Sequence, residues 1–121
     1  MIPQKLLDLL NTEGVVAFAT QGTNGPHVVN TWHSYVAVEG DKLYFPAGGM
    51  KNTEENLKAN SRVQLTMGGH DSEGKGIGFL IEGTAAFLYE GAGFDLVRNR
   101  FSWARAAVEI KVSNVQQTMG A

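Results

Sequence analysis

Runs of alternating apolar and polar residues recur along most of the chain, which is typical of antiparallel strands that bury one face. β-Branched and aromatic residues dominate six such runs, at positions 15–20, 27–38, 42–47, 62–67, 77–89 and 106–115. Turn signals separate consecutive runs, and Gly83 inside the fifth run predicts a bulge or bend. The pattern predicts a mainly β (α+β) fold in which six antiparallel strands form a small closed or partly closed barrel.

Three segments between these runs have helical spacing instead. Leucines at positions 3–12 predict a short amphipathic helix, and apolar residues at 93–103 predict another. Between them, Asn52 followed by Glu55 is a capping-box pattern, so a third helix is expected from Thr53 to about residue 59. These helices would flank the barrel.

Length and charge indicate a single soluble domain that spans residues 1–121. With 43% hydrophobic residues the chain can bury a real core. The net charge is -2 and the 10 Lys and Arg residues are scattered, which argues against a nucleic-acid surface. Cysteine is absent, so disulfides and thiolate metal sites are excluded. Without a membrane span or a convincing signal peptide, we expect a cytoplasmic protein with no membrane partner.

The second run carries more polar groups than a strand with one core face should. Its two faces are Val28, Asn30, Trp32, Ser34, Val36 and His27, Val29, Thr31, His33, Tyr35. Trp32 lies between two polar residues of its own face, which favours contact with a ligand over burial in a core. We therefore expect something other than water to cover the polar half of this strand.

The third run ends in a glycine loop that leads directly into a helix start. It reads Phe45-Pro46-Ala47-Gly48-Gly49-Met50-Lys51-Asn52-Thr53. Paired glycines leave backbone N–H groups uncovered, and a helix N-terminus adds unpaired donors and partial positive charge, so a phosphate would be stabilised here. The same residues would also suit a plain turn and a solvated helix start. With the aromatic strand beside it, the loop favours a phosphorylated ligand with a flat ring, for which flavin mononucleotide (FMN) is the candidate.

Several short motifs occur in a fixed order along almost the whole chain. They include Glu13-Gly14-Val15-Val16-Ala17, Asn30-Thr31-Trp32, Ser34-Tyr35, Pro46-Ala47-Gly48-Gly49-Met50, Thr53-Glu54, Gly78-Phe79-Leu80-Ile81 and Trp103-Ala104-Arg105-Ala106-Ala107. As an ordered set they resemble the small bacterial FMN-binding proteins of the pyridoxamine 5'-phosphate oxidase-like split-barrel group. The resemblance implies that the six strands form an antiparallel FMN-binding split β-barrel. It also implies a homodimer with one non-covalent FMN per subunit near the interface.

The resemblance further implies which residues contact FMN. The set is Asn30, Thr31, Trp32, Ser34, Tyr35, Pro46, Ala47, Gly48, Gly49, Lys51, Asn52, Thr53, Trp103 and Met119. Its aromatic side chains would surround the flavin ring, the backbone of 46–49 would contact the polar edge of the ring, and residues 51–53 would hold phosphate oxygens. Met119 would reach across the dimer to cover the ring.

The chain departs from the family pattern at two places. His33 stands where the family has Asn, and Lys51-Asn52 stands where the family has His-Lys, so the expected lysine is displaced by one position. We take Lys51 as the cation for the phosphate and Asn52 as an amide donor. Two aromatic assignments stay open, because regular alternation places Tyr35 on the opposite strand face and Trp103 would also suit a barrel core.

Three functions are compatible with the sequence. The first is a small FMN-dependent redox protein that passes electrons to or from a protein partner. The second is an FMN-dependent oxidoreductase, such as a flavin reductase or a pyridoxamine 5'-phosphate oxidase-like enzyme, with NAD(P)H or substrate near His33 and the loop 68–76. The third is a non-redox module that binds heme, a deazaflavin or a nucleotide. No catalytic residue is singled out, and no metal site is expected because His27 and His33 lie about 20 Å apart along one strand.

Overall fold

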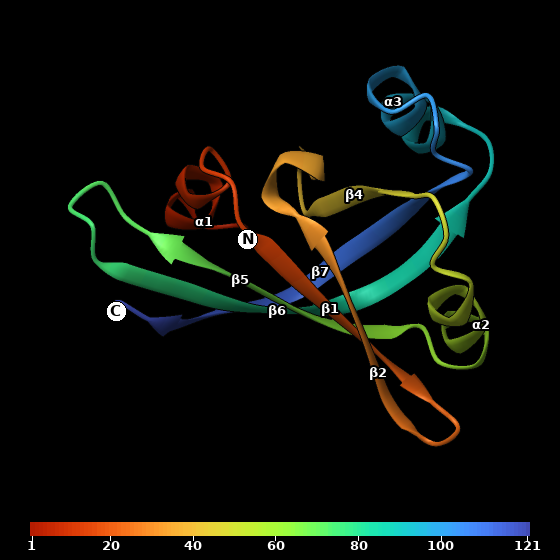
Figure 1. Cartoon of the computed structure of the whole chain (residues 1–121), viewed down its shortest axis with the longest axis horizontal. Coiled ribbons are helices and arrows are strands. Elements are labelled where there is room, and N and C mark those ends of the chain that lie inside the picture. Colours follow the sequence, from red (N-terminus) through yellow and green to blue (C-terminus); the bar gives the residue numbers. More distant parts are fainter.

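The chain forms one twisted antiparallel sheet with short helices around it (Figure 1). The structure is a computed structural model and describes all of residues 1–121. The strands are β1 (Val15–Gly22), β2 (Gly25–Trp32), β3 (Ala37–Glu39), β4 (Lys42–Ala47), β5 (Arg62–His70), β6 (Gly76–Leu88) and β7 (Ala106–Met119). The helices are α1 (Gln4–Leu9), α2 (Lys51–Ala59) and α3 (Ala92–Arg100), and a 3₁₀ turn, η1, covers His33–Tyr35. None of these helices has the length and apolar character needed to cross a membrane.

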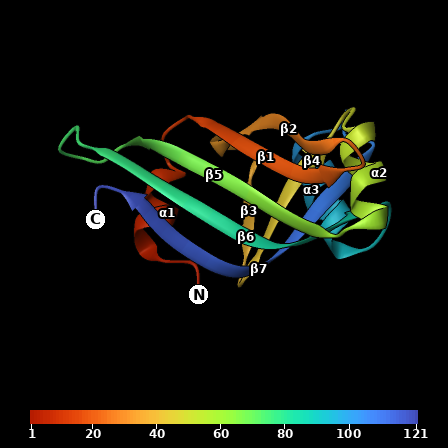
Figure 2. The same cartoon turned by 90° about the horizontal axis from the view of Figure 1, so that it is seen from below.

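The sheet order places the three longest strands, β5, β6 and β7, in the middle, with β2 and the short β3 at the two edges. The order is β2-β1-β5-β6-β7-β4-β3, and Figure 2 shows β1, β5, β6 and β7 side by side. The two end strands do not pair with each other, so the barrel stays open. The expected mainly β fold with flanking helices is thereby confirmed, as an open seven-stranded sheet.

Alternation along the central strands places the apolar core on one face of the sheet. On β5 every second residue within 63–67 is buried and the residues between them are exposed. Leu6 and Leu9 of α1 join this core, and a smaller cluster around Val97 lies beneath α3. Burial of each large apolar side chain contributes roughly 1.5–3 kcal/mol to the stability of the fold. The apolar face of the strands and α1 therefore pack against each other and form the core.

The sheet has seven strands and not the predicted six, because the expected strand 27–38 is interrupted. It ends at Trp32, turns through η1 and continues as the short β3. The His33 side chain turns into the protein, is 2% exposed, and its Nδ1 lies 2.8 Å from the carbonyl oxygen of Thr12. The ring packs so closely over Gly14 that a Cβ there would lie 2.5 Å from it. This inward histidine separates the two strand segments.

The start of α2 also differs from the prediction. The helix begins at Lys51 and not at Thr53, so Asn52 is inside the helix and is not the N-cap. The preceding residue, Met50, adopts left-handed backbone angles with φ 59° and provides no side-chain cap. Glu55 forms a surface ion pair within the helix and does not complete a capping box. The left-handed Met50 directly follows the two glycines and joins the loop to the first residue of α2.

The other boundaries shift by smaller amounts. α1 is shorter than the predicted 3–12, and α3 ends at Arg100 before the predicted 103. β7 continues beyond the predicted 115 to Met119. The predicted irregularity at Gly83 is confirmed, because the β6–β7 register shifts there and a Cβ would lie 2.2 Å from the Lys111 carbonyl oxygen.

Candidate cofactor site

The glycine loop between β4 and α2 forms the floor of the candidate site. Pro46 and Ala47 are buried in β4, where they pair with Ala107 and Ala106 of β7, so neither of these two predicted ligand residues is exposed. Gly48 and Gly49 are exposed, and a Cβ on Gly49 would meet nothing within 4 Å. A Cβ on Gly48 would lie 3.3 Å from the Trp103 ring. The loop therefore has one open side and one side covered by an indole.

At the start of α2, a buried hydroxyl lacks a hydrogen-bond partner. The Thr53 side chain is 0% exposed, and its Oγ1 has neither a donor nor an acceptor in contact. Buried polar atoms are almost always paired, and an unpaired one costs about 1–3 kcal/mol. Lys51 and Asn52 extend into solvent on the same helical turn. A hydroxyl, an ammonium, an amide and a helix N-terminus suit a phosphate group, so the residues present fit the predicted ligand.

Three aromatic rings form a cluster beside the loop. Tyr35 lies 5.0 Å from Phe101 and 5.8 Å from Trp103, and these two rings are 5.6 Å apart, all measured between centroids. Trp103 is 53% exposed, so the cluster presents an indole at its surface. The 3₁₀ turn η1 brings Tyr35 to this place, which regular strand alternation would not have done. Tyr35 and Trp103, whose positions the sequence left open, therefore lie in one aromatic cluster, and Trp103 lies against Gly48 of the loop.

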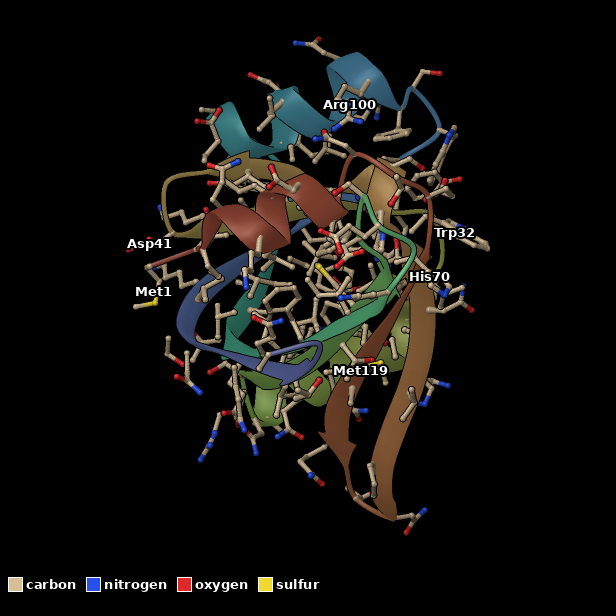
Figure 3. The ribbon with its side chains drawn as sticks, turned by 90° about the vertical axis from the view of Figure 1, so that its left-hand side faces the viewer. Met1, Trp32, Asp41, His70, Arg100 and Met119 are labelled. Atoms are coloured by element: carbon tan, nitrogen blue, oxygen red, sulfur yellow. The ribbon has the colours of Figure 1, made fainter.

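The strand β2 separates its predicted ligand residues by face. Asn30 and Trp32 are exposed on the outer face, whereas Thr31 is 6% exposed on the inner face. Trp32 is 38% exposed and is paired across the strands with Val15. Figure 3 shows its indole projecting away from the body of the protein. The three residues therefore do not present one common surface within a single chain.

Ser34 and Met119 occupy different surroundings from the loop. The Ser34 hydroxyl donates a hydrogen bond to Glu13 Oε2 at 2.5 Å, and the Ser34 backbone amide donates one to Glu13 Oε1 at 3.1 Å. These hydrogen bonds lower the pKa of Glu13. Met119 is 59% exposed near the C-terminus, at the opposite end of the molecule from α2 (Figure 1). Within one chain Met119 is remote from the glycine loop.

The sequence did not predict a hydrogen-bonded network of Arg105, Glu54 and Tyr89 that holds the glycine loop through the Gly49 carbonyl oxygen. Arg105 donates from Nε and Nη2 to the Gly49 carbonyl oxygen, at 2.9 and 2.6 Å. Its Nη1 lies 3.1 Å from Glu54 Oε1 and donates to the Tyr89 hydroxyl at 3.0 Å. The Tyr89 hydroxyl in turn donates to Glu54, and this hydrogen bond is the largest cause of a lowered Glu54 pKa, with Arg105 adding to it. The only sequence signal for this network was the position of Arg105 within the Trp103–Ala107 motif.

The chain as a whole matches a known protein family. A family comparison aligns residues 2–119 with the family described as pyridoxamine 5'-phosphate oxidase. The chain belongs to the pyridoxamine 5'-phosphate oxidase family. One relative, named FMN-binding protein, comes from Nitratidesulfovibrio vulgaris and is 46% identical over 123 residues. That alignment covers 98% of this chain and 100% of the relative.

Solved structures share the fold of this pyridoxamine 5'-phosphate oxidase family member at lower identity. HupZ of Group A Streptococcus superposes with a TM-score of 0.82 at 20% identity and covers 100% of this chain and 97% of its own. An FMN-binding protein from Syntrophomonas wolfei superposes with a TM-score of 0.71 at 17% identity, with 98% and 92% covered. At these identities the likeness establishes the fold and nothing more.

Proposed function

We propose that this chain is an FMN-binding flavoprotein that holds its cofactor without a covalent link. The observation that carries the proposal is the Thr53 hydroxyl, which is buried and unpaired at the start of α2. A phosphate oxygen would supply the acceptor that this hydroxyl lacks. The aromatic cluster at Trp103 adjoins the same loop, and the relative with 46% identity bears the name FMN-binding protein.

The phosphate and the ring would be held by different parts of the site. Lys51, Asn52 and Thr53 would bind the phosphate with charge-assisted hydrogen bonds, which contribute about 1.5–3 kcal/mol each. The exposed backbone of Gly48 and Gly49 and the aromatic cluster would contact the ring system. On this assignment, the loss of a phosphate-binding side chain weakens FMN binding but leaves riboflavin binding almost unchanged.

We propose electron transfer as the role of the bound flavin. FMN supplies one- and two-electron chemistry when bound, and the protein binds it, orients it and shields it from water. The Glu54 carboxylate is engaged by Arg105 and Tyr89, and the His33 ring is enclosed, so neither presents a free acid or base at the loop. This arrangement favours a carrier that exchanges electrons with a protein partner over an oxidoreductase with its own substrate chemistry.

We further propose that two copies of the chain form the functional unit. Val15, Val28 and Trp32 are 51%, 61% and 38% exposed and lie on the outer face of the neighbouring strands β1 and β2. Exposed apolar groups gathered on one sheet face are typical of an interface. A second copy that covers this face would bury these side chains, and its own Met119 could then complete the flavin site.

Cofactor release and a paired titration test the FMN proposal. The purified protein should show flavin absorption bands and release FMN, near one per chain, on heating. Thr53→Val keeps the shape of the side chain and removes the hydroxyl, so we expect it to weaken FMN binding by about 1.5–3 kcal/mol, or roughly 12- to 140-fold. Riboflavin affinity should stay within twofold, and Thr84→Val, at an exposed position of β6, should change neither affinity. A protein that stays colourless in the presence of FMN would overturn the proposal.

Steady-state assays separate the carrier from the enzyme. The reconstituted protein should exchange electrons with an artificial protein or dye acceptor after chemical reduction, yet oxidise NADH or NADPH no faster than free FMN does. Turnover of either nicotinamide well above the free-flavin rate would identify an oxidoreductase in place of a carrier.

A further inference from the structure

Arg105 fixes the glycine loop through both its backbone and its side chain. Its amide donates to the Ala47 carbonyl oxygen at 2.8 Å, where β4 ends. Its Nε and Nη2 donate to the Gly49 carbonyl oxygen at 2.9 and 2.6 Å. The two carbonyls flank Gly48, so Arg105, directly before β7, holds the loop on both sides of this glycine.

The guanidinium is itself held in a fixed orientation. Glu54 and the Tyr89 hydroxyl both lie within hydrogen-bond distance of Nη1, and the guanidinium lies 5.4 Å from the centroid of the Phe87 ring. The group is planar and its donors have a rigid fork geometry, so these contacts determine where the remaining donors point. The Glu54 carboxylate also balances its positive charge. Arg105 is therefore committed to the loop and is not a free cation for a ligand.

Arg105 has a direct consequence for the unpaired hydroxyl of Thr53. A threonine in a helix can donate its hydroxyl to the carbonyl three or four residues earlier, which for Thr53 belongs to Met50 or Gly49. A carbonyl oxygen has two lone pairs, and the Gly49 oxygen already accepts two hydrogen bonds from Arg105. The Met50 oxygen accepts a hydrogen bond from the Glu54 amide at 2.9 Å, and the Thr53 hydroxyl is left buried and unpaired.

We propose that Arg105 is a positioning residue for the phosphate monoester of FMN, through the Gly49 carbonyl. It does not touch the ligand. It occupies the Gly49 oxygen, so that the Thr53 hydroxyl stays available for a phosphate oxygen and the loop keeps its open shape. The inference rests on the proposed FMN function and names the residue that prepares the phosphate half of that site.

A ratio of two affinities tests this role. For each variant, the dissociation constant of riboflavin is divided by that of FMN, because this ratio reports the phosphate contribution and cancels losses at the ring. Arg105→Lys keeps the charge but cannot donate the forked pair of hydrogen bonds, and we expect it to lower the ratio about tenfold. Arg62→Lys is the matched control, since Arg62 is exposed on β5 and forms no ion pair; its ratio should equal that of the parent.

A double-mutant cycle shows whether Arg105 acts through Thr53. If it does, Arg105→Lys combined with Thr53→Val should lower the ratio no further than the larger of the two single changes, since the second change then removes nothing new. Losses that multiply would show that Arg105 acts independently of Thr53 and would overturn the inference. An unchanged ratio in Arg105→Lys would overturn it as well.

Two further readouts keep the outcomes distinguishable. If circular dichroism shows that Arg105→Lys does not fold, Tyr89→Phe takes its place, because it removes the hydroxyl that accepts a hydrogen bond from the guanidinium and lies at an exposed position. A riboflavin-to-FMN ratio lowered about threefold in Tyr89→Phe would support the inference. An unchanged ratio would overturn it. A parent protein that binds riboflavin as tightly as FMN would overturn the phosphate site and with it the proposed function. A parent that prefers FMN, together with unaffected Arg105 variants, would overturn only the role of Arg105.

Discussion

The Tyr35 ring lies against Trp103, with the centroids 5.8 Å apart and the ring planes at 52°. Tyr35 belongs to η1 and Trp103 to the connection between α3 and β7, so the contact joins two segments distant in sequence. Arg100 reinforces it by donating to the Ser34 and Val36 carbonyl oxygens at 2.8 and 3.2 Å. The aromatic side of the site is therefore built by two connections and not by the sheet itself.

Trp103→Leu should weaken the binding of FMN and riboflavin to the same extent. The indole is the exposed member of the cluster and adjoins Gly48, so its loss removes contact with the ring and leaves the phosphate half intact. Aromatic pairs contribute about 0.5–1.5 kcal/mol beyond burial, which corresponds to roughly 2- to 12-fold in each dissociation constant. Fluorescence titration with both ligands measures the effect, and Phe94→Leu on α3 is the control. A loss confined to FMN would place Trp103 at the phosphate instead.

Lys51→Gln should weaken FMN binding and flatten its dependence on ionic strength. Both Lys51 and Asn52 are exposed on the first turn of α2, but only the lysine carries a charge that salt screens. We expect the FMN dissociation constant to rise about 10-fold in Lys51→Gln and less than threefold in Asn52→Ala. Titrations at low and high salt provide the comparison. A larger effect at Asn52 would mean that the displaced lysine does not serve the phosphate.

The sheet was predictable because its signals are local. Alternation within 62–67 and the glycine at position 83 identified strands and a bend without knowledge of their partners, and the structure contains both. The end of the strand at Trp32 was not predictable, because it depends on the contact between the His33 ring and the Thr12 carbonyl oxygen, and these residues are distant in the sequence. Strand propensity alone continues through that position.

The candidate site was predictable only in part for the same reason. The glycine loop and the helix start are contiguous, so their fitness for a phosphate could be inferred from one stretch of sequence. The support from Arg105 is not contiguous: it requires β7 to pair with β4 and thereby bring Arg105 beneath Gly49. No pattern around Arg105 distinguishes an arginine that holds a loop from an ordinary surface arginine. Tertiary pairing, and not residue type, gives this side chain its role.

Tyr44 should make the stability of the fold sensitive to alkaline pH. Burial and the hydrogen bond to Glu109 raise its pKa from 10.0 to about 12. Because the folded state holds the proton more tightly than the unfolded state does, the stabilisation is fully present below pH 10 and is lost as the pH rises through 12. The shift of about two pKa units corresponds to at most about 3 kcal/mol.

Tyr44→Phe tests this dependence by removing the titrating group. The variant should have a lower free energy of unfolding at pH 8, by about 1 kcal/mol for the lost hydrogen bond. Between pH 10 and 12 its stability should then fall less steeply than that of the parent, as measured by urea unfolding. Parallel curves for Tyr44→Phe and the parent would show that Tyr44 titrates alike in both states.

Val28→Glu should separate the proposed dimer into monomers. Val28 is 61% exposed on the outer face of β2, so a charge there stays hydrated in a free monomer but would be desolvated in an interface that covers this face. Thr23→Glu adds the same charge at the exposed β1–β2 turn and is the control. Light scattering after size-exclusion chromatography should find the parent and Thr23→Glu as dimers and Val28→Glu as a monomer.

The flavin affinity of the same variant shows whether the site needs a second chain. Met119 ends β7 near the C-terminus, which lies at the opposite end of the chain from α2 (Figure 1), so in the proposed site it would contact the flavin from a partner. If the partner completes the site, monomeric Val28→Glu should bind FMN and riboflavin more weakly than Thr23→Glu does, and Met119→Ala should weaken binding in the dimer yet have no effect in the Val28→Glu background. Equal affinities in the monomer and the dimer would instead mean that Thr53, the glycine loop and the aromatic cluster suffice within one chain.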